Sequence, residues 1–249
     1  MQDDEKLPAH GRSNRPNPIK FSQIHTSCIC MSVGQLQNAN IAYLLGAFQS
    51  DGYFYKFNHK KRRRTYFRIG ISGNKNSMPM LESFKTIFNK EFRKNVTILK
   101  RRDRELFVIQ TSVNKLLKTL NYLEIIPKKF HAPKWINNLN LFGAYLAGLI
   151  DGDGDVRIRR KNYPQCAIRI TKGVKDIILI DQIKNFLNCN VSCYHVTTKS
   201  ILNGRKIIGR AFRIEFLVSS KNKELFKLYL LPFLRIVHKK QIIFNYLAN

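Results

Sequence analysis

Two apolar segments that each end in an aspartate and a glycine restrict the fold of this chain more than any other feature. Residues 146–154 read Leu-Ala-Gly-Leu-Ile-Asp-Gly-Asp-Gly, and residues 44–52 read Leu-Leu-Gly-Ala-Phe-Gln-Ser-Asp-Gly. Each segment predicts the last turns of a helix, so Asp51 and Asp153 are expected at helix C-termini. A carboxylate there opposes the negative end of the helix macrodipole and costs up to about 1 kcal/mol. Because the arrangement occurs twice, we infer that a cation offsets this cost.

Small residues recur one helical turn apart in both segments and share one helical face. They are Gly46 and Ser50 in the first segment and Gly148 and Gly152 in the second. Glycine inside a helix costs about 1 kcal/mol relative to alanine, so its repeated use indicates that two helix backbones approach closely. The sequence therefore predicts an interface between the two helices at these residues.

Parallel packing of the two helices would bring Asp51 and Asp153 together at one end. Two carboxylates held close together strongly favour a divalent cation, and hard oxygen ligands indicate Mg²⁺. The alternative for either motif alone is a helix C-cap followed by a turn. A calcium loop that starts at Asp151 is excluded, because its sixth position is Val156 rather than glycine and its twelfth is Asn162 rather than glutamate.

The charge of the chain indicates a polyanionic partner. Its 249 residues include 44 Lys+Arg against 16 Asp+Glu, a net charge of +28, while 44% of the residues are apolar. A core can therefore form, and basic residues interleaved with Tyr, Phe, Ile and Val favour nucleic-acid binding. A ribosomal protein would share the charge but not the regular repeat. There is no run of about 18 apolar residues, so we expect no membrane span.

The chain is expected to work inside the cell and not to be secreted. Its acidic, polar start does not resemble a secretory signal or a transit peptide. Its five cysteines, an odd number without zinc-ribbon spacing, indicate reduced thiols. Richness in Lys, Ile, Asn and Phe hints at an AT-rich genome, which makes the mitochondrion and the chloroplast candidate compartments.

One unit is used twice along the chain, after an irregular or disordered extension over residues 1–35. The two halves, 36–134 (half one) and 135–249 (half two), each predict the order αββαββα. In half one, helices are expected at about 38–51, 78–92 and 113–123, and strands at 53–60, 66–72, 96–100 and 106–111. In half two, helices are expected at about 141–153, 176–187 and 224–231, and strands at 156–160, 167–171, 191–197 and 211–218. Strand pairs joined by polar turns predict an α+β fold with antiparallel sheets.

The motifs resemble those of a known family, the LAGLIDADG homing endonucleases. Residues 146–154 depart from the namesake motif only at Gly152, and residues 44–52 keep its leucine, glycine, penultimate aspartate and final glycine. The resemblance covers about 38–249. It implies two pseudo-symmetric halves with the motif helices at their interface, and antiparallel sheets that form a basic saddle over double-stranded DNA.

By this resemblance Asp51 and Asp153 are the catalytic carboxylates that bind the metal. The backbone carbonyls of Ser50 and Gly152 are further ligands. Two or three divalent ions would be shared at the interface, Mg²⁺ with Mn²⁺ as a substitute. Where the motif has its first aspartate, half one has Gln49; that position is not the metal ligand, so activity is not put in doubt.

The family also implies basic residues that assist catalysis. Lys172 matches a position just past the second strand of half two, where half one has Gly73. Later lysines that reach back to the centre correspond to Lys239 or Lys240 and to Lys128 or Lys129. Of these we choose Lys172, Lys239 and Lys128.

Strand alternation predicts which side chains face the DNA, because successive side chains in a strand point to opposite faces. The expected contacts in half one are Tyr53, Tyr55, Phe57, His59, Arg68, Gly70, Ser72, Val108 and Gln110. Those in half two are Asp155, Arg157, Arg159, Lys161, Arg169, Thr171, Arg213 and Glu215, with Val156, Ile158, Ile168 and Ile170 on the opposite face. A two-stranded ribbon fits the major groove, where Arg reads guanine and Gln reads adenine. Most Lys and Arg would contact only phosphates.

The resulting hypothesis is a monomeric, Mg²⁺-dependent homing endonuclease. It would hydrolyse one phosphodiester in each strand of a long, nearly palindromic site, with water as the nucleophile, and leave short 3′ overhangs. The chain starts Met-Gln and ends Leu-Ala-Asn, unlike an intein, which favours an intron-encoded or free-standing enzyme. One alternative is an RNA maturase that binds intron RNA and assists splicing, with or without cleavage. The other is a non-catalytic nucleic-acid-binding protein on the same scaffold. Retention of Asp51 and Asp153 favours cleavage.

Overall fold

Two central helices begin at matching asparagines and end at the two aspartates of the motifs. Helix α1 spans Ala39–Asp51 and α4 spans Leu139–Asp153. The Asn38 side chain accepts a hydrogen bond from the Ile41 N–H, and the Asn138 side chain accepts one from the Leu141 N–H. These caps satisfy N–H groups that the first helical turn leaves without an intrahelical partner.

The structure is a computed structural model that describes residues 33–59, 61, 63–101, 105–126, 128–202 and 205–248. Residues 1–32 of the extension that was predicted over residues 1–35 therefore lie outside the described residues. Its last residues belong to a short 3-10 helix, η1 (Val33–Leu36). None of the described helices is long and apolar enough to cross a bilayer.

Both halves have the predicted order αββαββα. In half one, α1 is followed by β1 (Gly52–His59), β2 (Arg64–Gly73), η3 (Lys75–Ser77), α2 (Met78–Glu91), β3 (Ile98–Lys100), β4 (Phe107–Ser112), η4 (Asn114–Leu116) and α3 (Leu117–Tyr122). In half two, α4 is followed by β5 (Gly154–Arg159), β6 (Gln165–Lys172), α5 (Ile177–Leu187), β7 (Ser192–Leu202), β8 (Arg205–Leu217), α6 (Lys223–Leu225), η5 (Phe226–Leu230) and α7 (Val237–Ala248). The sheets are antiparallel with orders β1-β2-β4-β3 and β5-β6-β8-β7. The predicted fold class is confirmed.

Each motif helix runs directly into a strand, without the turn that the C-cap alternative requires. Gly52 and Gly154 have φ values of −78° and −83°, in the extended region. Glycine is needed there because space is short. A Cβ on Gly52 would lie 2.1 Å from the Phe48 ring, and one on Gly154 would lie 2.3 Å from the Ile150 carbonyl oxygen.

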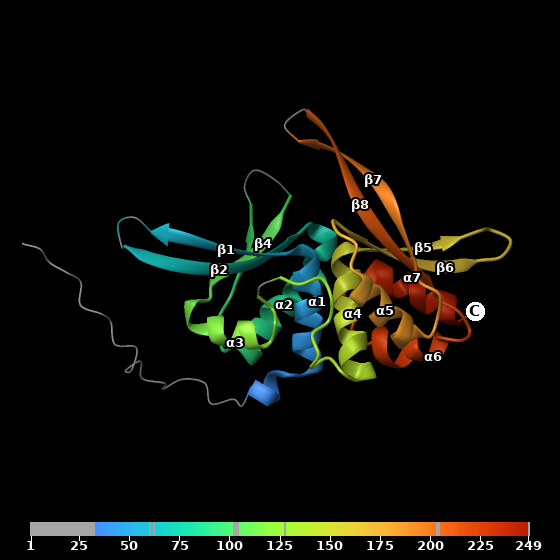
Figure 1. Cartoon of the computed structure of the whole chain (residues 1–249), viewed down its shortest axis with the longest axis horizontal. Coiled ribbons are helices and arrows are strands. Elements are labelled where there is room, and N and C mark those ends of the chain that lie inside the picture. The colour runs from blue at the N-terminus through green and yellow to red at the C-terminus, as the bar shows by residue number, and fades with distance from the viewer. Residues whose placement is uncertain are drawn as a thin grey trace, which may run out of the picture. The chain divides into compact units, whose positions relative to one another are not determined.

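The helices cover one face of both sheets and leave the other face open (Figure 1). On the covered face Ile69 and Ile71 of β2 and Ile168 and Ile170 of β6 are fully buried. Apolar side chains therefore alternate inward along the central strands, while the intervening side chains point away from the helices.

Two regions of half two differ from the prediction. Helix α7 was not predicted, although Lys239, Ile243 and Leu247 recur every four residues and are buried along it. The β7–β8 hairpin extends beyond the predicted ends of both strands, to the pair Leu202↔Arg205. An Asn-Gly pair at 203–204, a strong hairpin signal, is present in the sequence.

Candidate active site and nucleic-acid interface

Helices α1 and α4 pack against each other through their glycines. A Cβ on Gly46 would lie 2.1 Å from the Tyr145 carbonyl oxygen, and one on Gly148 would lie 2.2 Å from the Tyr43 carbonyl oxygen. Tyr43 and Tyr145 occupy the same place in the two motifs, so the contacts are reciprocal, as in an isologous interface. The predicted packing of the motif helices is confirmed, and it leaves no room for a side chain at either glycine.

The C-terminal ends of the two helices meet, and the two aspartates meet with them. A Cβ on Gly152 would lie 2.3 Å from Ser50 Cβ and 3.2 Å from Asp51 Oδ2. Asp153 follows Gly152 directly and ends α4. The structure therefore brings the two carboxylates, which are about a hundred residues apart in the chain, to one place.

The proximity of the carboxylates has an electrostatic consequence. Burial, and after it the negative charge of Asp153, raise the pKa of Asp51 from its ordinary 3.8 to about 6. Three nearby lysines oppose this shift without cancelling it. Two acids that are held together in this way favour a bound cation.

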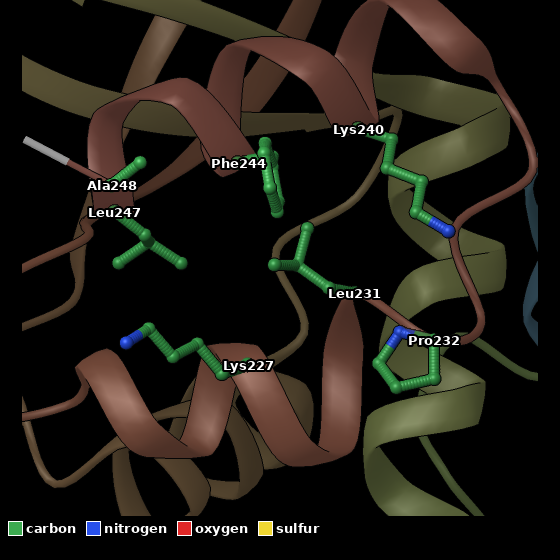
Figure 2. A pocket seen from close by; sticks show the side chains of 7 residues that line it. All are labelled: Lys227, Leu231, Pro232, Lys240, Phe244, Leu247 and Ala248. Atoms are coloured by element: carbon green, nitrogen blue, oxygen red, sulfur yellow. The ribbon is translucent and has the colours of Figure 1, made fainter.

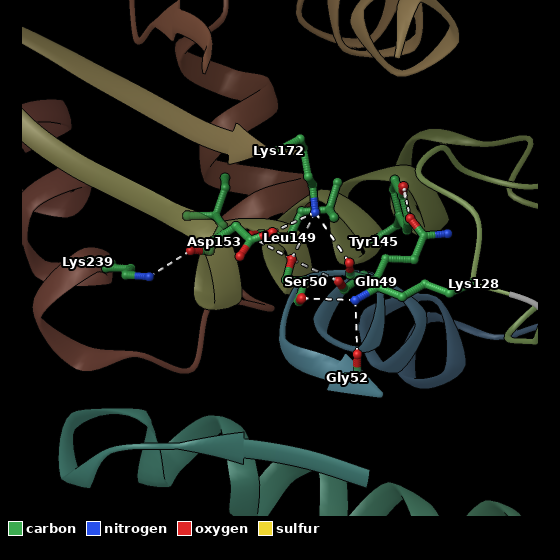
Figure 3. A network of polar contacts seen from close by, with 11 residues as sticks. Gln49, Ser50, Gly52, Lys128, Tyr145, Leu149, Asp153, Lys172 and Lys239 are labelled. Atoms are coloured by element: carbon green, nitrogen blue, oxygen red, sulfur yellow. Dashed lines mark hydrogen bonds and ion pairs between the residues drawn. The ribbon is translucent and has the colours of Figure 1, made fainter. Parts of the chain in front are cut away.

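Lys172 lies between the two helix ends (Figure 3). Its Nζ, at the end of β6, is 2.7 Å from Asp153 Oδ2 and 3.5 Å from both the Gln49 carbonyl oxygen and the Ser50 hydroxyl. The Lys172 side chain is only 3% exposed. It therefore places one buried positive charge against both negative helix termini.

Lys128 and Lys239 contact the ends of α1 and α4 respectively (Figure 3). The Lys128 Nζ donates to the carbonyls of Ser50 (3.1 Å) and Gly52 (2.9 Å). The Lys239 Nζ donates to the carbonyls of Ile150 and Asp151, both at 2.8 Å. Burial lowers the pKa of both lysines.

The neighbours of these lysines point elsewhere, so Lys128 and Lys239 are the members of the two pairs that reach the helix ends. Lys129 forms an ion pair with Glu124. Lys240 lines a hollow of about 420 Å³ between η5 and α7, together with Lys227, Leu231, Pro232, Phe244, Leu247 and Ala248 (Figure 2). This mainly apolar hollow contains none of the residues of the acid pair, so it does not belong to the candidate active site.

The donors at the joint helix ends fit a divalent metal ion. They comprise two hard carboxylates and nearby backbone carbonyls, the ligand types that Mg²⁺ prefers. No three His, Cys, Asp or Glu side chains gather at one point in the described part of the chain, so the remaining ligands would be carbonyls or water. The Ser50 carbonyl, a predicted ligand, accepts from Lys128, but a carbonyl oxygen has a second lone pair.

The predicted DNA-facing side chains of half one share the open face of their sheet. Tyr53 and Tyr55 stack with ring centroids 6.1 Å apart, and the Arg68 guanidinium lies 4.4 Å from the centre of the Phe57 ring. The Gln110 amide donates to the Tyr55 hydroxyl. This face is therefore aromatic, with one arginine and one amide among the rings. Ser72 and His59 lie on the same two strands, near opposite ends of the hairpin.

The corresponding face of half two is charged. The Glu215 carboxylate accepts hydrogen bonds from Arg159, from Arg169 Nε at 2.6 Å and from the Tyr194 hydroxyl at 2.9 Å. Burial alone would raise the pKa of Glu215, but these hydrogen bonds lower it to about 2. Glu215 therefore stays ionised and orients the two arginines.

The other predicted members of this face differ in their exposure and in their contacts. Asp155 pairs with Arg157 at 2.8 Å, and both are exposed. Arg213 lies opposite Thr171 in the β6–β8 register, and its buried Nε has no hydrogen-bond partner among the described residues.

Two predictions for β5 were wrong. Lys161 lies beyond the strand, because β5 ends at Arg159 and Arg160 takes a left-handed φ of 57°. Ile158 was expected on the buried face but is 47% exposed. β5 is an edge strand and Ile158 is its penultimate residue, so one flank of this side chain has no neighbouring strand to cover it.

Two tyrosines on the motif helices contact polar side chains of the opposite helix and were not predicted. The Tyr43 hydroxyl donates to Asp151 Oδ2 at 2.8 Å, and the Tyr145 hydroxyl donates to Gln49 Oε1 at 2.6 Å. Both tyrosines stand eight residues before the motif aspartate, so an alignment of the two motifs with each other would have matched them.

Comparison with known proteins shows similarity in structure only. The sequence matches no protein family description and no curated protein. A solved structure of mesophilic variants of the homing endonuclease I-DmoI is 19% identical and has a TM-score of 0.51, over 77% of this chain and 95% of that one. I-DmoI in complex with its target DNA in the presence of Mg is 20% identical, with a TM-score of 0.52 over 79% of this chain and 98% of that one.

These similarities extend over nearly all of each I-DmoI chain. At 19–20% identity they establish the fold. The chain therefore has the LAGLIDADG homing endonuclease fold, which confirms the resemblance that its two motifs carry.

Proposed function

We propose that this protein is a site-specific DNA endonuclease that uses a divalent metal ion to break both strands of a long target. One observation carries the proposal: Asp51 and Asp153 meet where the two motif helices end and the two sheets begin. A purely structural pair of helices has no need for two repelling carboxylates at its end. The similarity to I-DmoI, which has been solved in complex with its target DNA, supports the same function.

The two carboxylates would hold the metal, with the carbonyls of Ser50 and Gly152 as further ligands. A bound Mg²⁺ or Mn²⁺ would supply an activated water and stabilise the charge on the leaving oxygen. Lys172 contacts Asp153 and is buried between the helix ends, where its ammonium can stabilise the negative charge of a phosphate. Lys128 and Lys239 offset the negative helix termini, which lowers the repulsion of an incoming polyanion.

The open faces of the sheets would bind the DNA. In half two, Arg159, Arg169 and Arg213 provide guanidinium groups, the commonest readers of guanine and of phosphate. In half one, Gln110 and the neighbouring tyrosines provide hydrogen-bonding groups on an aromatic face. One chain supplies both carboxylates, so a second copy is not required, and we propose a monomeric homing enzyme encoded within an intron.

The test is to incubate the protein with a plasmid library that contains candidate target sequences, with and without Mg²⁺, and to sequence the cut ends. We expect Mg²⁺-dependent linear products with short 3′ overhangs. Asp51→Asn and Asp153→Asn should each lower double-strand cleavage by about 1,000-fold or more, roughly 4 kcal/mol of transition-state stabilisation. Binding to the same target at low salt should be retained.

Asp181→Asn is the matched control, because this exposed aspartate of α5 is outside the acid pair, and it should cleave like the parent. Salt-sensitive binding without any Mg²⁺-dependent nicking would contradict the proposed function and favour a non-catalytic binder. An Asp51→Asn protein that still linearises DNA would contradict the assignment of the site.

A further inference from the structure

A buried polar side chain stands two residues before each motif aspartate. It is Gln49 in half one and Asp151 in half two, and each is 1% exposed. Burial of an amide or a carboxylate costs free energy unless all of its hydrogen bonds are formed. The two residues differ in charge although they occupy the same place in the repeat, so their partners must differ as well.

In half two, Asp151 holds the chain segment that leads into α7. Its Oδ2 accepts the Arg235 N–H at 2.8 Å, and its Oδ1 accepts the Ile236 N–H at 3.2 Å. These peptide groups immediately precede α7, whose Lys239 donates to carbonyls at the end of α4. A carboxylate suits this position because both peptide partners are donors.

In half one, Gln49 does the same for the segment after α3. Its Nε2 donates to the His131 carbonyl at 3.1 Å. Three residues before His131, Lys128 donates to carbonyls at the end of α1. Here the peptide partner is an acceptor, and an amide can donate where a carboxylate cannot. The change from aspartate to glutamine thus follows the change in the peptide group.

Each of these side chains also accepts a hydroxyl hydrogen bond from the opposite motif helix. Tyr43 of α1 donates to Asp151, and Tyr145 of α4 donates to Gln49. The same polar group therefore connects three parts of the protein: its own helix, the partner helix and the segment that carries a lysine. Figure 3 shows the Tyr145–Gln49 contact beside Lys128 and Lys172.

We propose that Gln49 and Asp151 are positioning residues that set Lys128 and Lys239 at the helix ends, one lysine for each side of the active site. This inference rests on the proposed endonuclease function. Each residue acts through its lysine and touches neither metal nor DNA. Because there is one such lysine on each side, loss of one positioning residue should slow the cleavage of one DNA strand more than that of the other.

The two sides should not be equally sensitive. The segment at His131 has additional anchors, because Gln182 exchanges two hydrogen bonds with the backbone of Ala132 and the His131 ring lies 3.0 Å from Asp176. For the segment before α7, Asp151 accepts two consecutive peptide N–H groups. Asp151 should therefore matter more than Gln49.

The experiment compares four single variants on a plasmid target with each strand labelled separately: Asp151→Asn, Lys239→Met, Gln49→Met and Lys128→Met. Asp151→Asn should slow one strand by about 100-fold, the effect of a misplacement near 1 Å, and this should be the strand that Lys239→Met slows. Gln49→Met should slow the other strand by about tenfold, in parallel with Lys128→Met. The double variant Asp151→Asn with Lys239→Met should be no slower than the slower single variant, because both changes remove one function.

A merely structural role would give a different result. Both strands would then slow equally, in step with a fall in Tm, and the double variant would be additive; either outcome overturns the inference. Tyr43→Phe removes only one of the three hydrogen bonds to Asp151, so it keeps the test possible if Asp151→Asn does not fold. It should give the same strand bias at about tenfold. A parent protein that cuts no DNA defeats the proposed function itself, whereas a parent that cuts with unbiased variants defeats only this inference.

Discussion

Half one and half two use their hairpins in opposite ways. In half one the hairpin next to the motif helix is long, with β1 and β2 paired from Gly52↔Ile71 to His59↔Arg64, while β3 contributes only Ile98–Lys100. In half two the first hairpin ends at Arg159↔Gln165, and the second hairpin, β7–β8, continues to Leu202↔Arg205. Beyond the pair Lys172↔Phe212, β8 leaves β6 and pairs with β7 alone.

The helix interface shows no such divergence. Each central glycine meets the carbonyl of the equivalent tyrosine in the other helix. The close packing of the α1 and α4 backbones therefore restricts the sequence of both halves equally, because a single added atom would overlap a neighbour. Solvent-exposed hairpins can differ in length between the two halves, and the polar side chains on the open faces of the sheets can differ as well.

The largest effect is expected at the interface between the two motif helices. Gly46→Ala and Gly148→Ala should each destabilise the protein by about 3 kcal/mol or more, because a Cβ at either position lies within 2.2 Å of a carbonyl oxygen. Urea denaturation of both variants measures the effect. Gly173→Ala is the control, since nothing lies within 4 Å of its added Cβ. Equal stability of all three variants would show that the helices do not pack so closely.

The two halves also differ at the candidate active site, because half two has Lys172 at the position where half one has Gly73. Lys172→Met should reduce the cleavage rate by about 100-fold, because it removes a buried ammonium 2.7 Å from Asp153. Single-turnover cleavage at saturating Mg²⁺ is the measurement. Lys175→Met, an exposed lysine just past the same strand, should have little effect, and a similar loss in both variants would argue for a general charge effect.

The stability of the metal-free protein should report on the acid pair. Because the pKa of Asp51 is raised to about 6 when folded, its ionised form destabilises the fold above pH 6. This penalty shrinks as the pH falls through 6 and is absent below the ordinary pKa of 3.8. Asp51→Asn should therefore stabilise the metal-free protein at pH 8 by about 2 kcal/mol and by almost nothing at pH 4.

Thermal unfolding at the two pH values tests this sign. Mg²⁺ should raise the Tm of the parent at pH 8 but not that of Asp51→Asn, a readout that is independent of cleavage. A loss of stability in Asp51→Asn at pH 8 would mean that the carboxylate is stabilised by its lysines rather than destabilised by burial and by Asp153.

The smallest effect is expected on the charged face of half two. Glu215→Gln should release Arg159 and Arg169 from a carboxylate that holds both of them. Non-specific DNA affinity should rise by a few-fold, about 1 kcal/mol, with a steeper salt dependence, because more cationic charge can contact phosphate. Gln110→Glu changes charge in the opposite direction on the aromatic face of half one and should weaken binding. Unchanged salt slopes in both variants would place the DNA elsewhere.

Much of the architecture follows from local pattern in the sequence. The two motifs, their glycine spacing and the alternation of β2 and β6 were sufficient to predict the helix interface, the antiparallel sheets and which faces stay open. They succeed because close helix packing and strand alternation are short-range constraints with fixed periods. Strand β5 shows where this reasoning stops: the exposure of Ile158 depends on the place of β5 at the edge of the sheet, and local alternation does not contain that information.

The two motif aspartates and the short list of candidate lysines could be read from the sequence alone, because the repeat marks them. Only the tertiary structure decided which lysine of each pair lies at a helix end, since Lys128 and Lys129, like Lys239 and Lys240, are neighbours that differ only in direction. The tertiary structure also explains why residue 49 is a glutamine although half two has aspartate at the same place in the repeat. The physical reason is that a buried side chain is selected by the donor or acceptor it meets, and that partner comes from a segment about eighty residues away in the chain.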